Sequence, residues 1–326
     1  MRVLVTGAAG FIGRQLTKVL LERGTLAGPD GAPSAITELI LVDRAPFDGP
    51  RSEPVQVASF AGDLCDDGFL ARVMGDGVDS LFHLAATLTI DAETDPDSGW
   101  AVNLHLPLRM LEACRQLKPG TRFVYASSIA VFGGDLPDRV SDSQVQTPQT
   151  SYGTAKSVTE LLINDYSRHG FVDGRALRLP IVLVRPGAPT QAVSDRLASL
   201  VREPLSGRPA VSPVSGFTRF PVASVQRIAR NLVRLHDAPA SAFGSSRAVN
   251  QPGLTVSVDE MIAALGRVAG PAAAGCVTVD PVPAIQAVVD GWPREFVTAM
   301  DLDPPLQPDP DFDTIVRQYL ADHRPG

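Results

Sequence analysis

Long apolar runs and cysteine are both scarce in this chain of 326 residues. No apolar run reaches the roughly 18 residues that a membrane-spanning helix needs, so none is expected. The first apolar run, Arg2–Val5, turns glycine-rich at Gly7, and it is too short for the hydrophobic core of a secretory signal peptide. The three cysteines stand in no metal-ligand spacing, so the sequence predicts no metal site and favours a reducing, cytoplasmic location.

Lysine is scarce as well: only Lys18, Lys118 and Lys156 occur, and every other basic residue is arginine. A lysine at a mechanistically useful position is therefore informative. The 29 basic and 36 acidic residues give a net charge of −7, which argues against nucleic acid or an anionic membrane as the main partner. The length predicts two domains, or one large α/β domain with an appendage, and 44% apolar residues suffice for a sizeable core.

Short apolar runs alternate with helical patterns in the first half of the chain. We expect strands at Arg2–Val5, Leu39–Val42, Leu81–Leu84, Arg122–Ala126 and Arg175–Leu179, and helices at Phe11–Arg23, Ala101–Leu117 and Ser151–Arg168. This alternation is typical of βαβ units and predicts an α/β fold with a doubly wound parallel sheet, as in a Rossmann domain.

Proline and glycine become frequent after Pro180, which predicts a smaller C-terminal α/β domain, partly interleaved with the first. We assign residues 1–182 and about 221–250 to the first domain, and about 183–220 and 251–326 to the second, covering the carboxyl ends of the strands. Four helices are expected after Pro180, at Ser194–Arg202, Val222–His236, Met261–Val268 (after a capping box from Ser257 to Glu260) and Asp313–Leu320. Residues Pro304–Pro310 are expected to be irregular.

A glycine-rich turn between the first strand and the first helix predicts a dinucleotide site. Gly7 permits the tight turn, Gly10 lets the backbone approach a pyrophosphate, and Gly13 allows helix and strand to pack closely. Asp43 ends the second of the expected strands, where a carboxylate bonds the ribose 2′-hydroxyl, so NAD is preferred over NADP. The loop insertion Gly24–Ser34 explains its long spacing from Gly13, and Arg44 beside it leaves use of NADP open.

Two further segments are assigned to the same cofactor. Asp63 and Leu64 suit the adenine pocket, and Ala85 and Ala86, after the expected strand Leu81–Leu84, suit the pyrophosphate side. The first domain is therefore expected to bind NAD.

Tyr152 and Lys156 lie four residues apart at the start of an expected helix, so they share one face. Oxidation of an alcohol needs a base, and a tyrosine serves only if its pKa falls from about 10 toward neutrality. A lysine ammonium one turn away and the positive nicotinamide ring can both stabilise the phenolate. Ser127 and Ser128 follow the expected strand Arg122–Ala126, where a hydroxyl can polarise the reacting oxygen. Asn103 has two open interpretations, a water ligand on a proton relay or a polar group satisfied inside the helices.

The order of these motifs (TGAAGFIG, LVD, GDL, HLAA, VN, SSIAVFG and YGTAK) resembles that of the extended short-chain dehydrogenase/reductase superfamily, its epimerase-like branch. The resemblance covers about residues 1–185. It implies a catalytic set that consists of Ser128, Tyr152, Lys156 and Asn103. The catalytic serine is then Ser128 and not Ser127. Phe132 stands where many members carry tyrosine. The implied NAD-binding residues are Gly7, Gly10, Phe11, Ile12, Gly13, Asp43, Asp63, Leu64, Ala85, Ala86, Asn103, Tyr152, Lys156 and Pro180.

A second set of segments extends the resemblance over most of the chain: TPQTSYGTAK, LLINDYSRHGFVDGRALRLPIVLVRPG, NLVRLHDAPA, VNQPGLTVSVDEMIAALGRVAG and FDTIVRQY. They are similar to a subgroup of dehydrogenases that oxidise a D-erythronate-like aldonate at C2 to the 2-keto acid with NAD. The alternatives are a uronate dehydrogenase, a nucleotide-sugar epimerase or dehydratase of the same fold, and a non-catalytic NAD-binding regulator. The retained Tyr152 and Lys156 disfavour the regulator. The superfamily resemblance also implies a homodimer formed through Ala101–Leu117 and Ser151–Arg168.

A sugar acid carries a carboxylate that must be paired where water is excluded, and arginine pairs it best. Arg219 is the preferred candidate and Arg185 the second, although a salt bridge elsewhere is an equally open interpretation of both. The other predicted substrate contacts are Thr87, Ser128, Ile129 and Tyr152.

Overall fold

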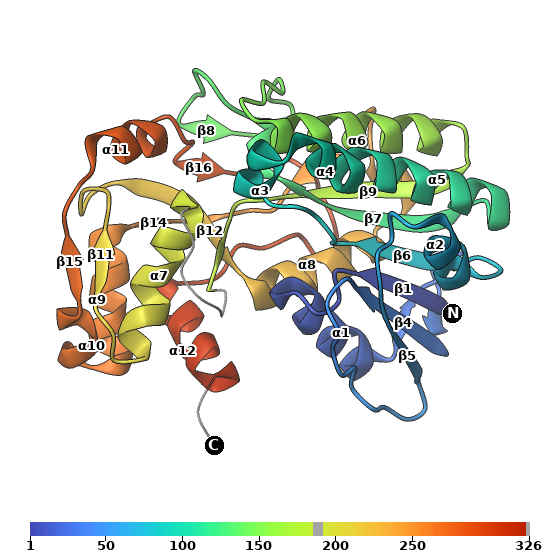
Figure 1. Ribbon diagram of the computed structural model, residues 1–326, viewed down its shortest axis with the longest axis horizontal. Helices are drawn as coiled ribbons and strands as arrows, with labels where there is room; N and C mark the ends of the chain where they lie inside the picture. Colours follow the sequence, from blue (N-terminus) through green and yellow to red (C-terminus); the bar gives the residue numbers. More distant parts are fainter. Residues whose placement is uncertain (185–191, 324–326) are drawn as a thin grey trace.

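The computed structural model describes residues 1–184 and 192–323, and its centre is a seven-stranded parallel sheet (Figure 1). The strands run in the order β13-β9-β7-β6-β1-β4-β5. Their bounds are β1 (Arg2–Thr6), β4 (Glu38–Asp43), β5 (Gln56–Ala61), β6 (Ser80–His83), β7 (Thr121–Ser128), β9 (Val172–Leu179) and β13 (Ala248–Asn250). The strand order reverses beside β1, and ligands of such sheets bind outside the carboxyl ends of the strands at that point.

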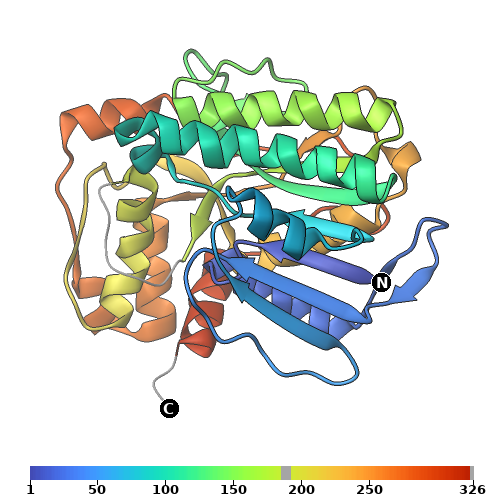
Figure 2. The ribbon, with the colours of Figure 1, turned by 45° about the vertical axis from the view of Figure 1, so that its right-hand side comes forward.

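Helices cover both faces of this sheet. Figures 1 and 2 show α5 and α6 side by side on one face, while α1 and α8 lie together on the other. The bounds are α1 (Phe11–Arg23), α2 (Asp67–Met74), α3 (Thr89–Thr94), α4 (Pro96–Trp100), the π-helix η1 (Ala101–His105), α5 (Leu106–Leu117), α6 (Ser151–Arg168) and α8 (Val225–Asp237). Each face buries its own apolar cluster, centred on Leu16 and Leu232 below the sheet and on Met110 and Ile163 above it.

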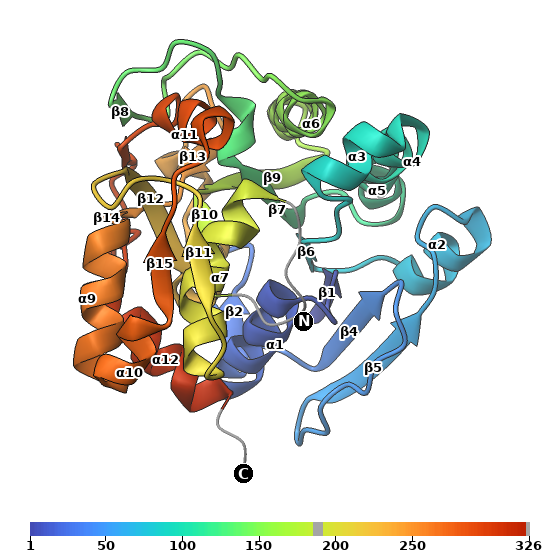
Figure 3. The ribbon, with the colours of Figure 1, turned by 60° about the vertical axis from the view of Figure 1, so that its left-hand side comes forward.

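A second group of elements lies beside the carboxyl ends of the parallel strands (Figure 3). Its three-stranded sheet pairs β10 (Ile181–Leu183), β12 (Arg219–Ser224) and β14 (Leu254–Ser257), and β11 (Ala210–Ser212) pairs with β15 (Val277–Val279). The helices are α7 (Val193–Leu205), α9 (Val258–Ala269), α10 (Pro271–Gly275), α11 (Pro283–Asp290) and α12 (Phe312–Asp322). The predicted capping box is present: Ser257 and Glu260 each bond the other's backbone N–H at the start of α9.

Residues Gly24–Ser34, expected to be a loop, instead contain most of a hairpin, β2 (Thr25–Ala27) and β3 (Pro33–Ala35). Its strands have three residues each, too few to show the alternating pattern of a strand. The hairpin is held by distant residues: Asp237 accepts from the Ala27 N–H at 2.8 Å. Four other short elements complete the fold: the paired β8 (Arg139–Val140) and β16 (Glu295–Phe296), and the turns η2 (Ile129–Val131) and η3 (Ala240–Ala242).

Helix α8 begins at Val225 and not at Val222 as expected, because the preceding residues pair as strand β12. Ser224 caps the helix by accepting from the Arg227 N–H at 3.1 Å. Its hydroxyl also donates to Asp309 Oδ1 at 2.6 Å, which ties the segment Pro304–Pro310 to the start of the helix. This segment is irregular, as expected. In the described part of the chain, no helix combines the length and apolarity needed to cross a membrane.

Two buried histidines predict how stability depends on pH. His83 bonds Thr6 and His236 bonds Ser80, and burial lowers the pKa of His83 to about 3 and of His236 to about 4. Unfolding restores a pKa near 6.5 to both, so the unfolded chain binds more protons in mildly acidic solution. We expect the free energy of unfolding to fall between pH 6.5 and 5, with a slope for each histidine that approaches about 1.4 kcal/mol per pH unit toward pH 5.

Urea unfolding at several pH values measures this slope. The substitution His236→Asn is expected to halve it, whereas His105→Gln, at an exposed position, leaves it unchanged. A stability that does not change over this pH range contradicts the prediction.

Candidate active site

A cavity of about 1300 Å³ runs along the carboxyl ends of the parallel strands, and the second group of elements closes one side of it. Its lining includes the turn after β1, the ends of β4, β6 and β7, and the first residues of α6. The opposite wall comes from the start of α7, from Val288 within α11, and from residues 291–293 directly after that helix. The cavity thus lies at the reversal of strand order where a dinucleotide is expected.

At Gly7 and Gly13, the glycine turn around the start of α1 leaves no room for a side chain. Gly7 has a positive φ of 69°, and a Cβ there would lie 2.9 Å from the Ala85 backbone nitrogen. A Cβ on Gly13 would lie 2.2 Å from the Gly7 carbonyl oxygen. Phe11 and Ile12 line the cavity at the first turn of the helix, whose N-terminal residue Gly10 provides no side-chain cap. Free N–H groups of this kind suit a pyrophosphate.

Asp43 lines the cavity at the end of β4 and is held there by backbone groups. Its Oδ2 accepts from Ala9 N at 3.0 Å, and its Oδ1 accepts from Ala45 N at 3.1 Å. Arg44, Asp63 and Leu64 line the same end of the cavity. The residues therefore fit the adenosine half of NAD, with a fixed carboxylate for the ribose.

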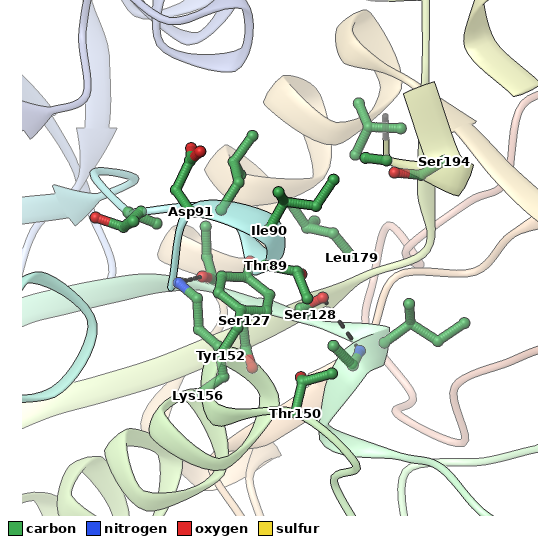
Figure 4. Close-up of a pocket in the computed structure, with 18 of the residues that line it drawn as sticks. Thr89, Ile90, Asp91, Ser127, Ser128, Thr150, Tyr152, Lys156, Leu179 and Ser194 are labelled. Atoms are coloured by element: carbon green, nitrogen blue, oxygen red, sulfur yellow. Dashed lines mark hydrogen bonds between the residues drawn. The ribbon is translucent and has the colours of Figure 1, made fainter. Parts of the chain in front are cut away.

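Helix α6 carries Tyr152 and Lys156 into the middle of the cavity (Figure 4). Thr150 caps the helix by accepting from the Gly153 N–H at 3.0 Å. A Cβ at Gly153 would lie 2.1 Å from the Ala130 carbonyl oxygen, so this glycine brings the helix start against the chain that follows Ser128. The sequence analysis did not single out Gly153, because only the neighbouring segment reveals the close approach.

Lys156 is buried, with 2% of its surface exposed. Its ammonium donates to the Ala126 carbonyl oxygen at 2.8 Å and lies 4.4 Å from the centre of the Tyr125 ring. Burial lowers the pKa of Lys156 to about 7, against the charge of Glu160, which raises it. The side chain therefore sits where a small change in nearby charge decides whether it is protonated.

Burial raises the pKa of Tyr152 to about 12, although a hydrogen bond with Ser128 works in the opposite direction. The lysine and the positive nicotinamide ring were together expected to bring this pKa toward neutrality. The protein alone does not, because the cost of burying a phenolate exceeds the stabilisation from the Ser128 hydrogen bond. A further positive charge beside the phenol is needed.

The two serines at the end of β7 occupy different surroundings. Ser127 is 2% exposed, and its hydroxyl donates to Glu160 Oε1 at 2.5 Å. Ser128 is partly exposed, accepts from the Ala130 N–H at 3.1 Å and bonds Tyr152. Ser128 is therefore the serine whose hydroxyl is placed toward the phenol, as the family resemblance implies.

Asn103 is buried in η1 and does not line the cavity. Its side chain bonds both backbone groups of Thr87, accepting from the N–H at 3.0 Å and donating to the carbonyl oxygen at 2.9 Å. This geometry matches the second interpretation, a satisfied polar group that fixes the loop after β6. Five other predicted residues, Ala85, Ala86, Thr87, Ile129 and Pro180, line the cavity.

Arg219 does not line the cavity, which corrects its predicted contact with a substrate carboxylate. It lies at the start of β12 with its side chain 44% exposed, and it pairs with Glu260 at 3.2 Å. The predicted residue Arg185 lies outside the described residues. Among the described residues, the cations lining the cavity are Lys156 and, at the adenosine end, Arg44. No group of three or more potential metal ligands occurs in the described part of the chain.

The cavity also contains residues that the sequence analysis missed: Thr89, Asp91, Gln149, Thr150, Leu179, Ser194 and Trp292. Thr150 had a local signal, since a threonine before a helix is a common cap. Ser194 and Trp292 had none, because they reach the cavity only when the second group of elements folds against the sheet.

The chain belongs to the NAD dependent epimerase/dehydratase family, whose model matches residues 3–246. NAD is therefore its cofactor, and the expected extended short-chain dehydrogenase/reductase fold is confirmed. Its sequence is 42% identical to D-erythronate dehydrogenase from Cupriavidus necator, over 99% of this chain and 98% of that protein. It is 36% identical to the D-erythronate dehydrogenase of Haemophilus influenzae, over 98% and 99% of the two chains.

Two solved structures are similar over nearly the whole chain. A nucleoside-diphosphate-sugar epimerase from Agrobacterium tumefaciens superposes with a TM-score of 0.90 at 33% identity, covering 99% of this chain and 94% of that one. A GalE-like L-threonine dehydrogenase from Cupriavidus necator superposes with a TM-score of 0.80 at 24% identity, covering 99% of each chain, and this likeness concerns the fold alone.

Proposed function

We propose that the protein is an NAD-dependent dehydrogenase that oxidises a short sugar acid, a D-erythronate-like aldonate, at C2 to the 2-keto acid. The observation that carries the proposal is the placement of Tyr152, Lys156 and Ser128 together in the cavity that begins at the glycine turn. The two relatives named D-erythronate dehydrogenase, similar over almost their full length, support the choice of substrate.

In this proposal NAD, when bound, supplies the hydride acceptor and a second positive charge beside the phenol. Lys156 stabilises the phenolate form of Tyr152, and the phenolate Oη takes the proton of the substrate hydroxyl and becomes the neutral phenol. Ser128 donates a hydrogen bond to the reacting oxygen. Asn103 holds the Thr87 backbone that lines the cavity next to these groups.

A nucleotide-sugar epimerase is the second candidate, because the Agrobacterium structure named for that activity is similar over the whole chain. The dehydrogenase and epimerase activities differ in their use of the cofactor. A dehydrogenase releases one reduced NAD for each substrate oxidised, whereas an epimerase returns the hydride and accumulates none.

The test is NAD reduction, followed by the absorbance of the reduced nicotinamide, with a panel of four- to six-carbon aldonates and uronates. We expect steady turnover with a four-carbon aldonate and formation of a 2-keto acid, detected as its hydrazone. Turnover with uronates alone supports the uronate dehydrogenase alternative. Absence of turnover with every acid, together with interconversion of nucleotide sugars, contradicts the proposal.

The cofactor preference gives a separate prediction at Asp43. Its carboxylate is held by Ala9 and Ala45, and it repels a 2′-phosphate. We expect Asp43→Ser to narrow the preference for NAD over NADP by about tenfold or more, because Arg44 is then free to meet the phosphate. The ratio of kcat/KM values for the two cofactors measures this, with Asp30→Ser in the exposed β2–β3 turn as control. Equal use of both cofactors by the unaltered protein contradicts it.

We also propose that residues 1–182 and about 221–250 form the NAD domain and that the remaining residues form the substrate domain.

We propose in addition that the protein works as a homodimer in the cytoplasm. Exposed Leu117 on α5 and Leu161 on α6 support dimerisation through these helices. The three free cysteines support a reducing location. Light scattering after size-exclusion chromatography tests the dimer, and Leu161→Glu is expected to yield a monomer.

A further inference from the structure

A buried stripe on α6 faces the carboxyl end of β7. Tyr152, Lys156 and Glu160 are spaced four residues apart, so they share one face of the helix. Lys156 Nζ donates to the Ala126 carbonyl oxygen at 2.8 Å, and Ser127 Oγ donates to Glu160 Oε1 at 2.5 Å. The helix therefore holds two consecutive residues of β7, directly before the serine that bonds Tyr152.

Glu160 is 2% exposed, and donors from three other segments surround its carboxylate. Arg178 of β9 donates through Nε to Oε1 at 3.0 Å and through Nη2 to Oε2 at 2.8 Å. Gln146, from the segment before α6, also donates to Oε2. A buried carboxylate is very costly unless it is paired and hydrogen-bonded, so this set of donors explains how the charge is tolerated.

The groups facing the Lys156 ammonium come from each element packed around it. Tyr152 and Glu160 lie on its own helix, Tyr125 on β7 has its ring 4.4 Å away, and the electrostatic effect of the ammonium reaches His83 on β6. Of these, Glu160 carries the charge that stabilises the ammonium.

Two other carboxylates contact α6, but at its ends. Glu93 accepts from the Ser151 N–H at 2.6 Å, and Glu112 accepts from the Tyr166 hydroxyl.

We propose that Glu160 is a positioning residue of the site, which keeps Lys156 charged and holds Ser127, and thereby the adjoining Ser128, against α6. The proposal rests on the proposed dehydrogenase chemistry for its importance to turnover. This role explains why a carboxylate is buried on the same face of α6 as Tyr152 and Lys156, at a position that no substrate reaches. Glu160 does not line the cavity, so it acts through its neighbours.

The scarcity of lysine permits a test that does not depend on turnover. Lysine labelled with ¹³C at Cε gives signals from only three side chains, and Lys18→Arg and Lys118→Arg assign Lys156. The titration midpoint of Lys156 is followed in the full-length protein, with and without NAD. We expect Glu160→Gln to lower this midpoint by about 1 pH unit or more, since an opposite charge nearby is lost.

Asp173→Asn is the matched control. Asp173 pairs with Arg122, Arg175 and Arg247 near the start of the same strand β9. Its loss also leaves arginines without a carboxylate, yet the Lys156 midpoint is expected to stay unchanged. Equal shifts of the Lys156 midpoint in Asp173→Asn and in Glu160→Gln would mean that a general loss of packing, and not the Glu160 charge, changes the midpoint. That result would overturn the proposal.

Glu160→Gln leaves the buried Arg178 unpaired and risks unfolding the protein. The double variant Glu160→Gln with Arg178→Met removes both charges, so the titration is repeated in it. An unchanged Lys156 midpoint in whichever of the two variants folds overturns the proposal.

Glu160→Asp, which keeps the charge, is expected to restore a midpoint close to that of the unaltered protein. With an oxidisable substrate, the alkaline limb of the kcat profile shifts by the same amount as the midpoint. If no aldonate is oxidised, the proposed function fails while the titration still decides the role of Glu160.

Discussion

Replacing Tyr152 with phenylalanine is expected to lower kcat by about 10²–10⁴-fold, the usual contribution of a positioned general base. The phenol is the group placed to take the hydroxyl proton, since it lies in the cavity and bonds Ser128. Phenylalanine keeps the ring and its packing while removing only the oxygen. The dissociation constant for NAD is therefore expected to stay within a few-fold, and kcat is measured by NAD reduction.

Tyr166→Phe is the matched control for this prediction. Tyr166 lies on the same helix, and its hydroxyl bonds Glu112 on α5, away from the cavity. Its loss should leave kcat nearly unchanged. A Tyr152→Phe enzyme with near-normal kcat at neutral pH would assign the proton transfer to another group.

The second large effect is expected for Lys156→Met. Methionine is of similar length but carries no charge, so the phenolate of Tyr152 loses its ammonium and the Ala126 carbonyl loses its donor. Removing a hydrogen bond from a charged group costs about 1.5–3 kcal/mol, which corresponds to about 10–100-fold in rate. We expect kcat to fall by at least this factor, and NAD to bind more weakly because the lysine also faces the nicotinamide ribose in the proposed complex.

Stability distinguishes a chemical effect from a folding defect. Burial disfavours the charged lysine, whose pKa it lowers to about 7, so an apolar side chain of the same length is tolerated at this position. The melting temperature of Lys156→Met should therefore not fall. Lys18→Met, at an exposed position on α1, provides the control. Retained activity with a normal melting temperature would show that the ammonium is dispensable.

The sequence by itself determined the features that depend on neighbours a few residues apart. The bounds of α1 and α6 are those expected, because apolar spacing and capping residues act within one or two turns of helix. The glycine turn and the Tyr152–Lys156 spacing are local for the same reason, and both predict their place in the cavity. The α9 capping box also required only four consecutive residues.

Only the tertiary structure decided what depends on contacts between distant segments. Three strands of the second group, β10, β11 and β15, have three residues each, so their pattern is too short to predict and their pairing partners define them. Arg219 was expected beside the substrate, but its pairing with Glu260 on the surface follows from the register of β12 with β14.

The surroundings of the charged groups also required the folded chain. Tyr152 has a raised pKa, and Glu160 lies buried against Arg178, because both are desolvated by segments far away in sequence. Spacing along a helix determines which side chains share a face. The cost of burying their charges depends on what the rest of the chain brings against that face.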